Sequence, residues 1–142
     1  MPNPRKPWSR PALNRHLLSL LDRPSTTLTS GALRKEVAAR VEFDPNYPPA
    51  YVRVQVDANN TPVARFVIHE LLHVVMSEKV LGLDETLEEV LIVALEAHLW
   101  AFVEKSKSRR TKWDSLIERK LAEHCATLTD RTIEEIVDRT EG

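Results

Sequence analysis

The pattern of apolar and polar residues changes from a period of two to a helical period near the middle of the chain. In the segment 50–57, valines at every second position alternate with polar or larger residues, and this alternation predicts a half-buried strand. Val41–Phe43 is its expected antiparallel hairpin partner, with the proline-rich residues 44–49 as the turn. A small antiparallel sheet is therefore expected ahead of the long helical region.

Two helices are predicted before this strand. Leucines recur at helical spacing in Pro11–Asp22, which indicates a short amphipathic helix, and Pro24 helps to end it. Ser30 is a good N-cap for a second helix that continues to about Val41. Residues 1–10 are rich in proline and basic side chains, so a flexible arm is expected there.

The second half of the chain has the periodicity of helices. One is expected over residues 62–81, because Thr61 is a good N-cap and proline is favoured at the first helical position. The next is expected over residues 85–105, with Asp84 or Thr86 as its cap. A short connection between them makes the two helices antiparallel neighbours.

The C-terminal part is expected to hold a basic linker at residues 105–112. Two further helices are predicted after it, at about residues 112–125 and 129–139. The whole order is helices, a small sheet and then four helices. This order predicts an α+β fold in which helix dominates.

The composition is that of an ordinary globular protein, with 42% hydrophobic and 29% charged residues. Its 142 residues suit one domain over residues 11–142, with a core at about 50–104 and C-terminal helices at 112–140. No apolar run reaches the roughly 18 residues of a membrane span, and the N-terminus lacks a signal-peptide pattern, so a cytoplasmic protein without a membrane partner is expected. Cys125 is the only cysteine, so no intrachain disulfide can form.

Basic and acidic residues nearly balance, with 20 Lys and Arg against 21 Asp and Glu, so no global basic field points to nucleic acid. The one basic patch is Lys105–Lys112, which could contact phosphates if Trp113 offered a stacking surface. We expect instead that this patch is a solvated linker with helix-end charges and that Trp113 lies in the core. Nucleic acid is therefore not the expected partner, and such binding would show a steep salt dependence.

The strongest chemical signal is the HELLH motif at residues 69–73, inside a predicted helix. Because four residues make about 1.1 turns, His69 and His73 project from one face and can share a tetrahedral zinc ion. Glu70 then lies beside the open position of the metal, where it can take a proton from a water whose pKa zinc lowers to about 7. The neighbouring residues are apolar, so these three side chains would be costly to bury without partners. We expect one Zn²⁺ per chain and Glu70 as the general base.

The third protein ligand is expected from the following helix. No histidine follows at the spacing that metzincins use, so the candidates are the acids of residues 85–105. Glu89 and Glu96 are seven residues apart and share one face, and helix rise places the level of His73 between them. Glu89 is the favoured ligand. Glu96 is either an acceptor for a histidine N–H or the ligand itself, and Glu88 is the remaining alternative.

The stretch 65–75, with the sequence RFVIHELLHVV, resembles the motif helix of the ImmA/IrrE family and is similar to that of small phage or prophage zincins. In the ImmA/IrrE family a strand precedes this helix, and a glutamate in the next helix completes the site. Glu89, five residues before Ala94, is similar to that glutamate. The resemblance covers about residues 50–104. It implies a gluzincin-type, zincin-like fold, a zinc cofactor and activity on protein or peptide substrates.

Hydrolysis of peptide bonds by a zinc metalloendopeptidase is therefore the expected activity. In zincins the peptide pairs with an edge strand, for which Tyr51–Asp57 is the natural candidate. A donor that stabilises the transition state would be Tyr47, Tyr51, His98 or His124, and the sequence does not choose among them. The alternative is a catalytically silent zincin-fold binding module in a phage or regulatory complex.

Overall fold

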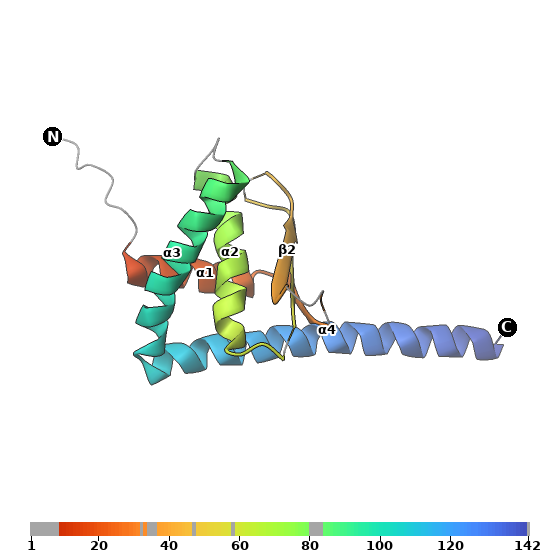
Figure 1. The fold of residues 1–142 in the computed structure, drawn as a ribbon. Coiled ribbons are helices and arrows are strands. Elements are labelled where there is room, and N and C mark those ends of the chain that lie inside the picture. Colours follow the sequence, from red (N-terminus) through yellow and green to blue (C-terminus); the bar gives the residue numbers. More distant parts are fainter. Residues whose placement is uncertain are drawn as a thin grey trace.

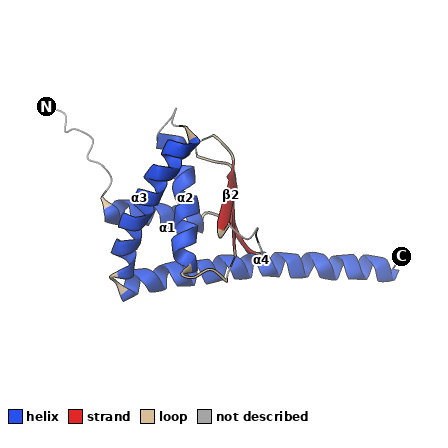
Figure 2. Ribbon diagram, viewed as in Figure 1, coloured by secondary structure: helices blue, strands red, loops and turns tan. Residues whose placement is uncertain are grey.

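The computed structural model describes residues 9–31, 33, 37–46, 48–57, 59–79 and 84–141, and the structural statements below concern these residues. They form α1 (Arg10–Asp22), β1 (Thr26–Ser30), β2 (Ala39–Phe43), β3 (Val52–Val56), α2 (Val63–Lys79), α3 (Glu85–Glu104) and α4 (Lys107–Glu141). Helices α2 and α3 stand side by side, with the sheet beyond α2, and α4 runs across their lower ends and projects past the sheet (Figure 1). Helix dominates this α+β arrangement, as predicted (Figure 2).

The sheet has the strand order β1-β3-β2. Strands β2 and β3 form the predicted antiparallel hairpin, with Val41 opposite Val54. Strand β1 pairs with the other side of β3 and runs parallel to it, with Leu28 also opposite Val54. The prediction of a wholly antiparallel sheet is therefore wrong. Burial explains the third strand, since Leu28 and Val54 are both almost completely buried and extend one apolar face of the sheet.

The predicted helix from Ser30 to Val41 is also wrong, because Ser30 ends β1 and Val41 lies within β2. Residues 32 and 34–36 of that prediction lie outside the described residues. The threonine-rich sequence of β1 had indicated only a helix break, yet β-branched threonines favour a strand when one face can be buried. Thr26 is buried, and its Oγ1 donates to the Leu20 carbonyl oxygen at 2.7 Å.

Helix α4 is continuous over 35 residues from Lys107, so the predicted linker at 105–112 is reduced to residues 105 and 106, and the predicted break near residue 128 is wrong. Thr129 was a candidate N-cap of the helix predicted at residues 129–139, but no helix begins there. Thr127 Oγ1 and Thr129 Oγ1 instead donate to the carbonyl oxygens four residues earlier, at 3.1 and 2.9 Å. A hydroxyl satisfied in this way remains inside a helix.

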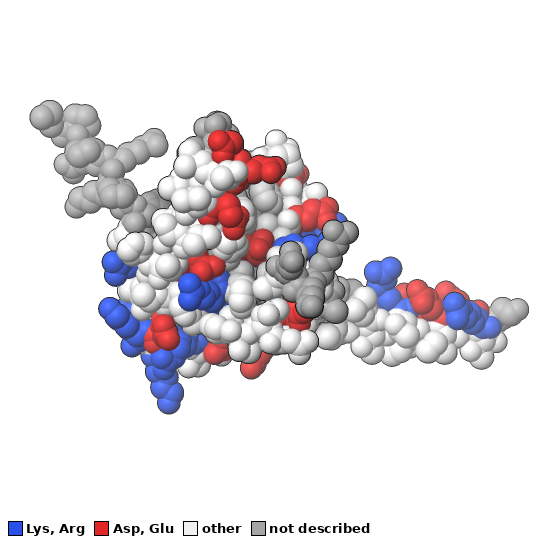
Figure 3. Space-filling model, in the orientation of Figure 1, with Lys and Arg blue, Asp and Glu red and all other residues white. Residues whose placement is uncertain are grey.

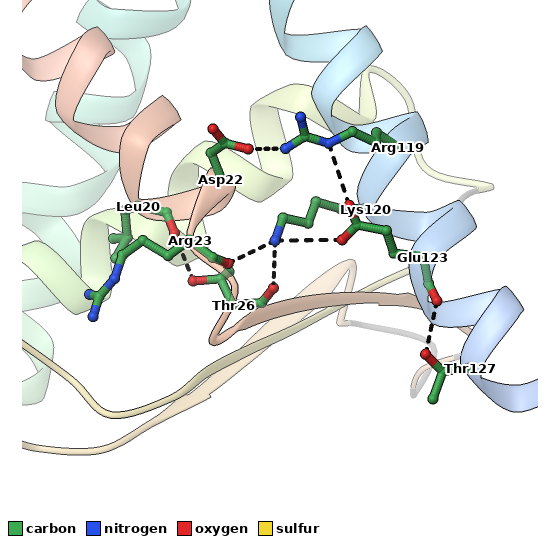
Figure 4. A network of polar contacts seen from close by, with 8 residues as sticks. All are labelled: Leu20, Asp22, Arg23, Thr26, Arg119, Lys120, Glu123 and Thr127. Carbon is green, nitrogen blue, oxygen red and sulfur yellow. Dashed lines mark hydrogen bonds and ion pairs between the residues drawn. The ribbon is translucent and has the colours of Figure 1, made fainter. Parts of the chain in front are cut away.

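Two buried polar contacts attach the first half of α4 to α1 and β1. Trp113 is completely buried, and its Nε1 donates to Asn14 Oδ1 at 2.8 Å. Lys120 is 3% exposed, and its Nζ donates to the carbonyl oxygens of Arg23 at 2.7 Å and Thr26 at 3.0 Å (Figure 4). Tertiary contacts of this kind favour a helix that begins at Lys107, although the sequence had predicted a linker up to residue 112.

The remaining helix boundaries lie close to their predicted positions. Ser9 Oγ accepts from Ala12 N–H at 3.3 Å and caps α1, so Ser9 and Arg10 belong to the helix rather than to the predicted arm. Residues 1–8 of the arm lie outside the described residues. Asp84 caps α3 as predicted, with its Oδ1 accepting from Leu87 N–H at 2.8 Å.

The core lies between α2, the sheet and the three other helices. Its largest fully buried side chains include Trp113, Leu17, Leu21, Leu28, Ile68, Leu71, Leu72, Ile92 and Leu99. Three of these come from α2 and flank the histidines of the HELLH motif, so the motif lies at the boundary between the core and α3. Within the described ranges, no helix combines the length and the apolar composition that a membrane crossing requires.

Candidate metal centre

His69 and His73 lie one turn apart on α2, on the side that meets α3. Their ring centroids are 5.2 Å apart and their planes cross at 67°. Both side chains are partly buried, because the rest of this turn of α2 packs into the core. His69 and His73 lie together because they are four residues apart on one helix, as predicted.

Glu89 of α3 completes the cluster. Its Oε1 lies 2.9 Å from His69 Nε2, and its Oε2 lies 3.1 Å from His73 Nε2. One ligand atom from each of these three residues lies within 4.8 Å of the others. Ligand atoms around tetrahedral zinc, with bonds of about 2.0–2.2 Å, are about 3.3–3.6 Å apart. The three side chains are therefore spaced so that they could hold a metal ion after a small adjustment.

Glu96 lies against the other nitrogen of His69. Its Oε1 is 2.8 Å from His69 Nδ1, and its Oε2 accepts from Arg65 Nε at 2.9 Å. A carboxylate at Nδ1 favours the tautomer with the proton on that atom, which leaves the lone pair of Nε2 free for a metal. Of the two roles considered for Glu96, the geometry matches that of an acceptor that orients a histidine.

Arg65 was not identified as a site residue from the sequence. It lies four residues before His69 on α2, so both side chains leave the helix on the same face. Its ion pair joins α2 to α3 across 31 residues of sequence, and only the folded structure brings Glu96 into reach. The i, i+4 spacing of Arg65 and His69 was the one available signal.

Glu88 lies at the margin of the cluster. Its Oε1 is 3.9 Å from His73 Nδ1, which is too long for a hydrogen bond. Glu88 also belongs to the acidic first turn of α3, where a carboxylate is favourable next to the helix N-terminus. The structure therefore brings Glu89, rather than Glu88, between the two histidines.

Glu70 is 9% exposed and lies on α2 beside the histidines. Burial raises the pKa of its carboxyl from 4.5 to about 7, and His69 lowers it while Glu89 and Glu96 raise it further. Among the described residues, no side chain or backbone group forms a hydrogen bond with this carboxyl. A buried carboxyl without a protein partner next to two histidines is suited to hold and release a proton.

The sequence also named four possible donors for the transition state. Tyr47 lies outside the described residues, and His98 is exposed on α3. Tyr51 lies beneath the guanidinium of Arg53 at 4.8 Å, and His124 borders a cavity on the outer face of the sheet. None of these three described side chains has a hydrogen bond or ion pair with the cluster.

The prediction that Tyr51–Asp57 is an edge strand open to a substrate is wrong. These residues include β3, which is the central strand and has a neighbouring strand on each side. The edge strand next to α2 is β2, whose end at Phe43 shares a small recess with Val74 and Ser77 of α2. Trp113 is in the core, as expected, which removes the stacking surface from the basic patch.

No protein-family model, curated protein or solved structure matches this chain.

Proposed function

We propose that this chain is a zinc-dependent metallopeptidase with a zincin-like fold. The observation that carries the proposal is the convergence of His69 Nε2 and His73 Nε2 on the two carboxylate oxygens of Glu89, with buried Glu70 beside them. These three residues would hold one Zn²⁺ and leave its fourth position to water. The resemblance of residues 65–75 to the ImmA/IrrE motif helix supports the same interpretation.

Each side chain of the cluster has a separate task in this proposal. When bound, zinc supplies a Lewis acid that polarises the scissile carbonyl and makes water a better nucleophile at neutral pH. Glu70 takes a proton from the attacking water as the new C–O bond forms, and returns it to the amine nitrogen as the C–N bond breaks. Glu96 keeps Nδ1 of His69 protonated, and Arg65 holds Glu96 in place.

A peptide substrate would pair with β2. Asp44 N–H donates to the Tyr51 carbonyl oxygen, and Asp57 N–H donates to that of Ala38, so every second residue of β2 is bonded to β3. Ala39, Val41 and Phe43 then direct their backbone groups toward the open edge. An extended peptide can add there as a further strand through main-chain hydrogen bonds.

Zinc content tests the metal half of the proposal. Protein purified without chelator should contain one zinc per chain, and zinc should raise the melting temperature of metal-free protein. Glu85→Gln is the matched control, because it removes an exposed carboxylate from the same helix without touching the histidines. Absence of stoichiometric zinc together with an unchanged melting temperature would refute the site.

Glu70→Gln tests the catalytic half. The variant should bind zinc as the wild type does, while cleavage of a quenched fluorescent peptide library falls by at least about a hundredfold, the lower end for loss of a general base. Equal behaviour of the zinc-loaded wild type and the variant in this assay would instead favour the catalytically silent binding module.

A further inference from the structure

The exposed surface of α3 carries several large apolar side chains. The described chain has ten exposed large hydrophobic residues, and five of them lie on this one helix: Leu87, Val90, Leu91, Val93 and Leu95. Val90 is 61% exposed and Val93 is 50% exposed. A contiguous apolar patch of this kind marks an interaction surface rather than a scatter of single residues.

The apolar residues of this surface form one stripe along α3. Leu87, Val90 and Leu91 are followed at helical spacing by Ala94, Ala97 and Ala101, all of them exposed, with the exposed His98 among them. The opposite side of the same helix, with Ile92, Leu99 and Val103, is buried in the core. We call the exposed stripe the α3 face. A helix that is apolar on both sides is normally covered on both sides.

The sizes of the side chains favour antiparallel pairing of the α3 face with a second copy of itself. The larger residues, Leu87, Val90 and Leu91, lie in the first half of the helix, and Ala97 and Ala101 lie in the second half. Two antiparallel copies that cross midway between Ala94 and Leu95 place Leu87 of one beside Ala101 of the other, and Leu91 beside the imidazole of His98. This arrangement lets the two helices pack closely.

Charge favours the same orientation. The N-terminal end of α3 is acidic, with Asp84, Glu85 and Glu88, whereas basic residues gather at the α3–α4 corner: Lys105, Lys107, Arg109, Arg110 and Lys112. Figure 3 shows acidic side chains above and basic side chains below a mostly uncharged surface. An antiparallel second copy brings the acidic end of each helix beside the basic corner of the other, which is electrostatically complementary.

We propose that the protein is a two-fold symmetric homodimer in which the α3 faces of two copies pack antiparallel. Helices α2 and α3 of both subunits then form a four-helix arrangement of the type found in bundles. Asp84 would lie near Lys105 of the partner subunit, and Leu87 near Ala101 of the partner subunit. Glu89 and Glu96 face α2, so both His69 clusters remain accessible.

Light scattering after size-exclusion chromatography tests the dimer. The wild type should have twice the 16.2 kDa mass of one chain. Val90→Glu should raise the dissociation constant at least about a hundredfold, because two unpaired charges would be buried. Leu128→Glu is the matched control, since it adds the same charge to an exposed apolar residue of α4 and should leave the dimer intact. Zinc content and circular dichroism verify that both variants are folded.

A monomeric wild type over the accessible concentration range overturns the proposal. A dimer that Leu128→Glu dissociates and Val90→Glu does not also overturns it, because the apolar face of α4 would then be the interface.

Cysteine cross-linking tests the antiparallel alignment, in a Cys125→Ser background. Ala94→Cys lies beside the two-fold axis, so it should form a covalent dimer with itself under mild oxidation. Two copies of Ala101→Cys would be about 20 Å apart along the helices, beyond disulfide reach, and should not cross-link. When the single variants Leu87→Cys and Ala101→Cys are mixed, one subunit of each should form a covalent dimer. Efficient self-cross-linking of Ala101→Cys, or none with Ala94→Cys, contradicts this alignment.

Discussion

Two pairs of helices in this molecule bury polar side chains, and they do so in opposite ways. Between α1 and α4, the buried Trp113 Nε1 and the Lys120 ammonium both have acceptors. Trp113 Nε1 donates to Asn14 Oδ1, and the Lys120 ammonium donates to two carbonyl oxygens at the end of α1 and the start of β1 (Figure 4). Buried polar groups that are satisfied in this way stabilise one particular packing of the helices.

Between α2 and α3, the acceptors outnumber the donors. Glu70, Glu89 and Glu96 surround His69 and His73, and Arg65 is the permanently charged cation that contacts this group. Burial, together with the neighbouring Glu89 and Glu96, disfavours the charged form of Glu70 and raises its pKa to about 7. A divalent cation among them would reverse that balance.

The contrast shows that a buried polar residue is not in itself a sign of function. Lys120 is more deeply buried than His69 or His73, yet its contacts are complete and need nothing further. The unbalanced charge, rather than the burial, distinguishes the α2–α3 cluster. Substitutions in the two regions should therefore have opposite consequences for stability and for zinc binding.

The largest effect is expected from His73→Ala. Loss of a metal ligand should lower zinc affinity by at least about a thousandfold, since loss of an outer partner alone costs about 10- to 100-fold. The unfolding free energy of the metal-free protein should change by less than about 1 kcal/mol, because the Glu89 carboxylate that His73 contacts is half exposed and water screens their interaction. Titration calorimetry and urea unfolding measure the two quantities.

His98→Ala is the control for that experiment, because it removes an exposed histidine from α3. It should leave zinc affinity unchanged. If His73→Ala binds zinc as tightly as the wild type, the difference between the two regions disappears and the cluster is not a metal site.

Lys120→Met should have the reverse effect. It leaves the carbonyl oxygens of Arg23 and Thr26 without their donor in a buried place, which should lower the unfolding free energy by about 2–3 kcal/mol. Zinc affinity should not change, because α4 contributes nothing to the cluster. Lys112→Met, an exposed position on the same helix, is the control and should be nearly neutral. A loss of zinc affinity in Lys120→Met would show that the two regions are coupled.

Local spacing made much of the cluster predictable from the sequence. His69 and His73 share a helix face, and the seven-residue spacing of Glu89 and Glu96 placed both carboxylates toward the same neighbour. The choice between the two glutamates was not predictable, because it depends on how far α3 slides along α2. Arg65 fixes that relation through its bond to Glu96, a contact between residues far apart in sequence.

The parts of the fold that were missed depend on distant contacts in the same way. The threonines of β1 form a strand because β3 offers a free edge and the core accepts Leu28. The threonines of α4 remain helical because Trp113 and Lys120 hold the preceding turns against α1. In both places the local sequence allowed two structures, and packing chose between them. Strand β3 needed no such choice, because its alternating valines predicted it directly.

Glu96→Gln sharpens the comparison within the cluster. An amide can still contact His69 Nδ1 and Arg65, but it no longer favours the protonated Nδ1 so strongly. Zinc affinity should fall by about 10- to 100-fold, as for other carboxylates that orient a metal-binding histidine. Glu104→Gln is the control at the exposed end of α3. A fall as large as that of His73→Ala would identify Glu96 as a ligand, which contradicts the assignment of Glu89.

The smallest effect concerns the pH dependence of stability at the α1–α4 junction. Burial lowers the pKa of the Lys120 ammonium from 10.5, and Glu123 offsets part of that change. Between the lowered pKa and 10.5 the unfolded chain binds more protons at this residue than the folded chain, so this group makes stability rise with pH there. In Lys120→Met that rise is absent, and the gap in unfolding free energy between wild type and variant should widen as pH increases through this window. Urea unfolding at several pH values measures the gap, and Lys112→Met should give a constant one. A gap for Lys120→Met that stays constant or narrows would mean that the buried ammonium is no harder to charge than an exposed one.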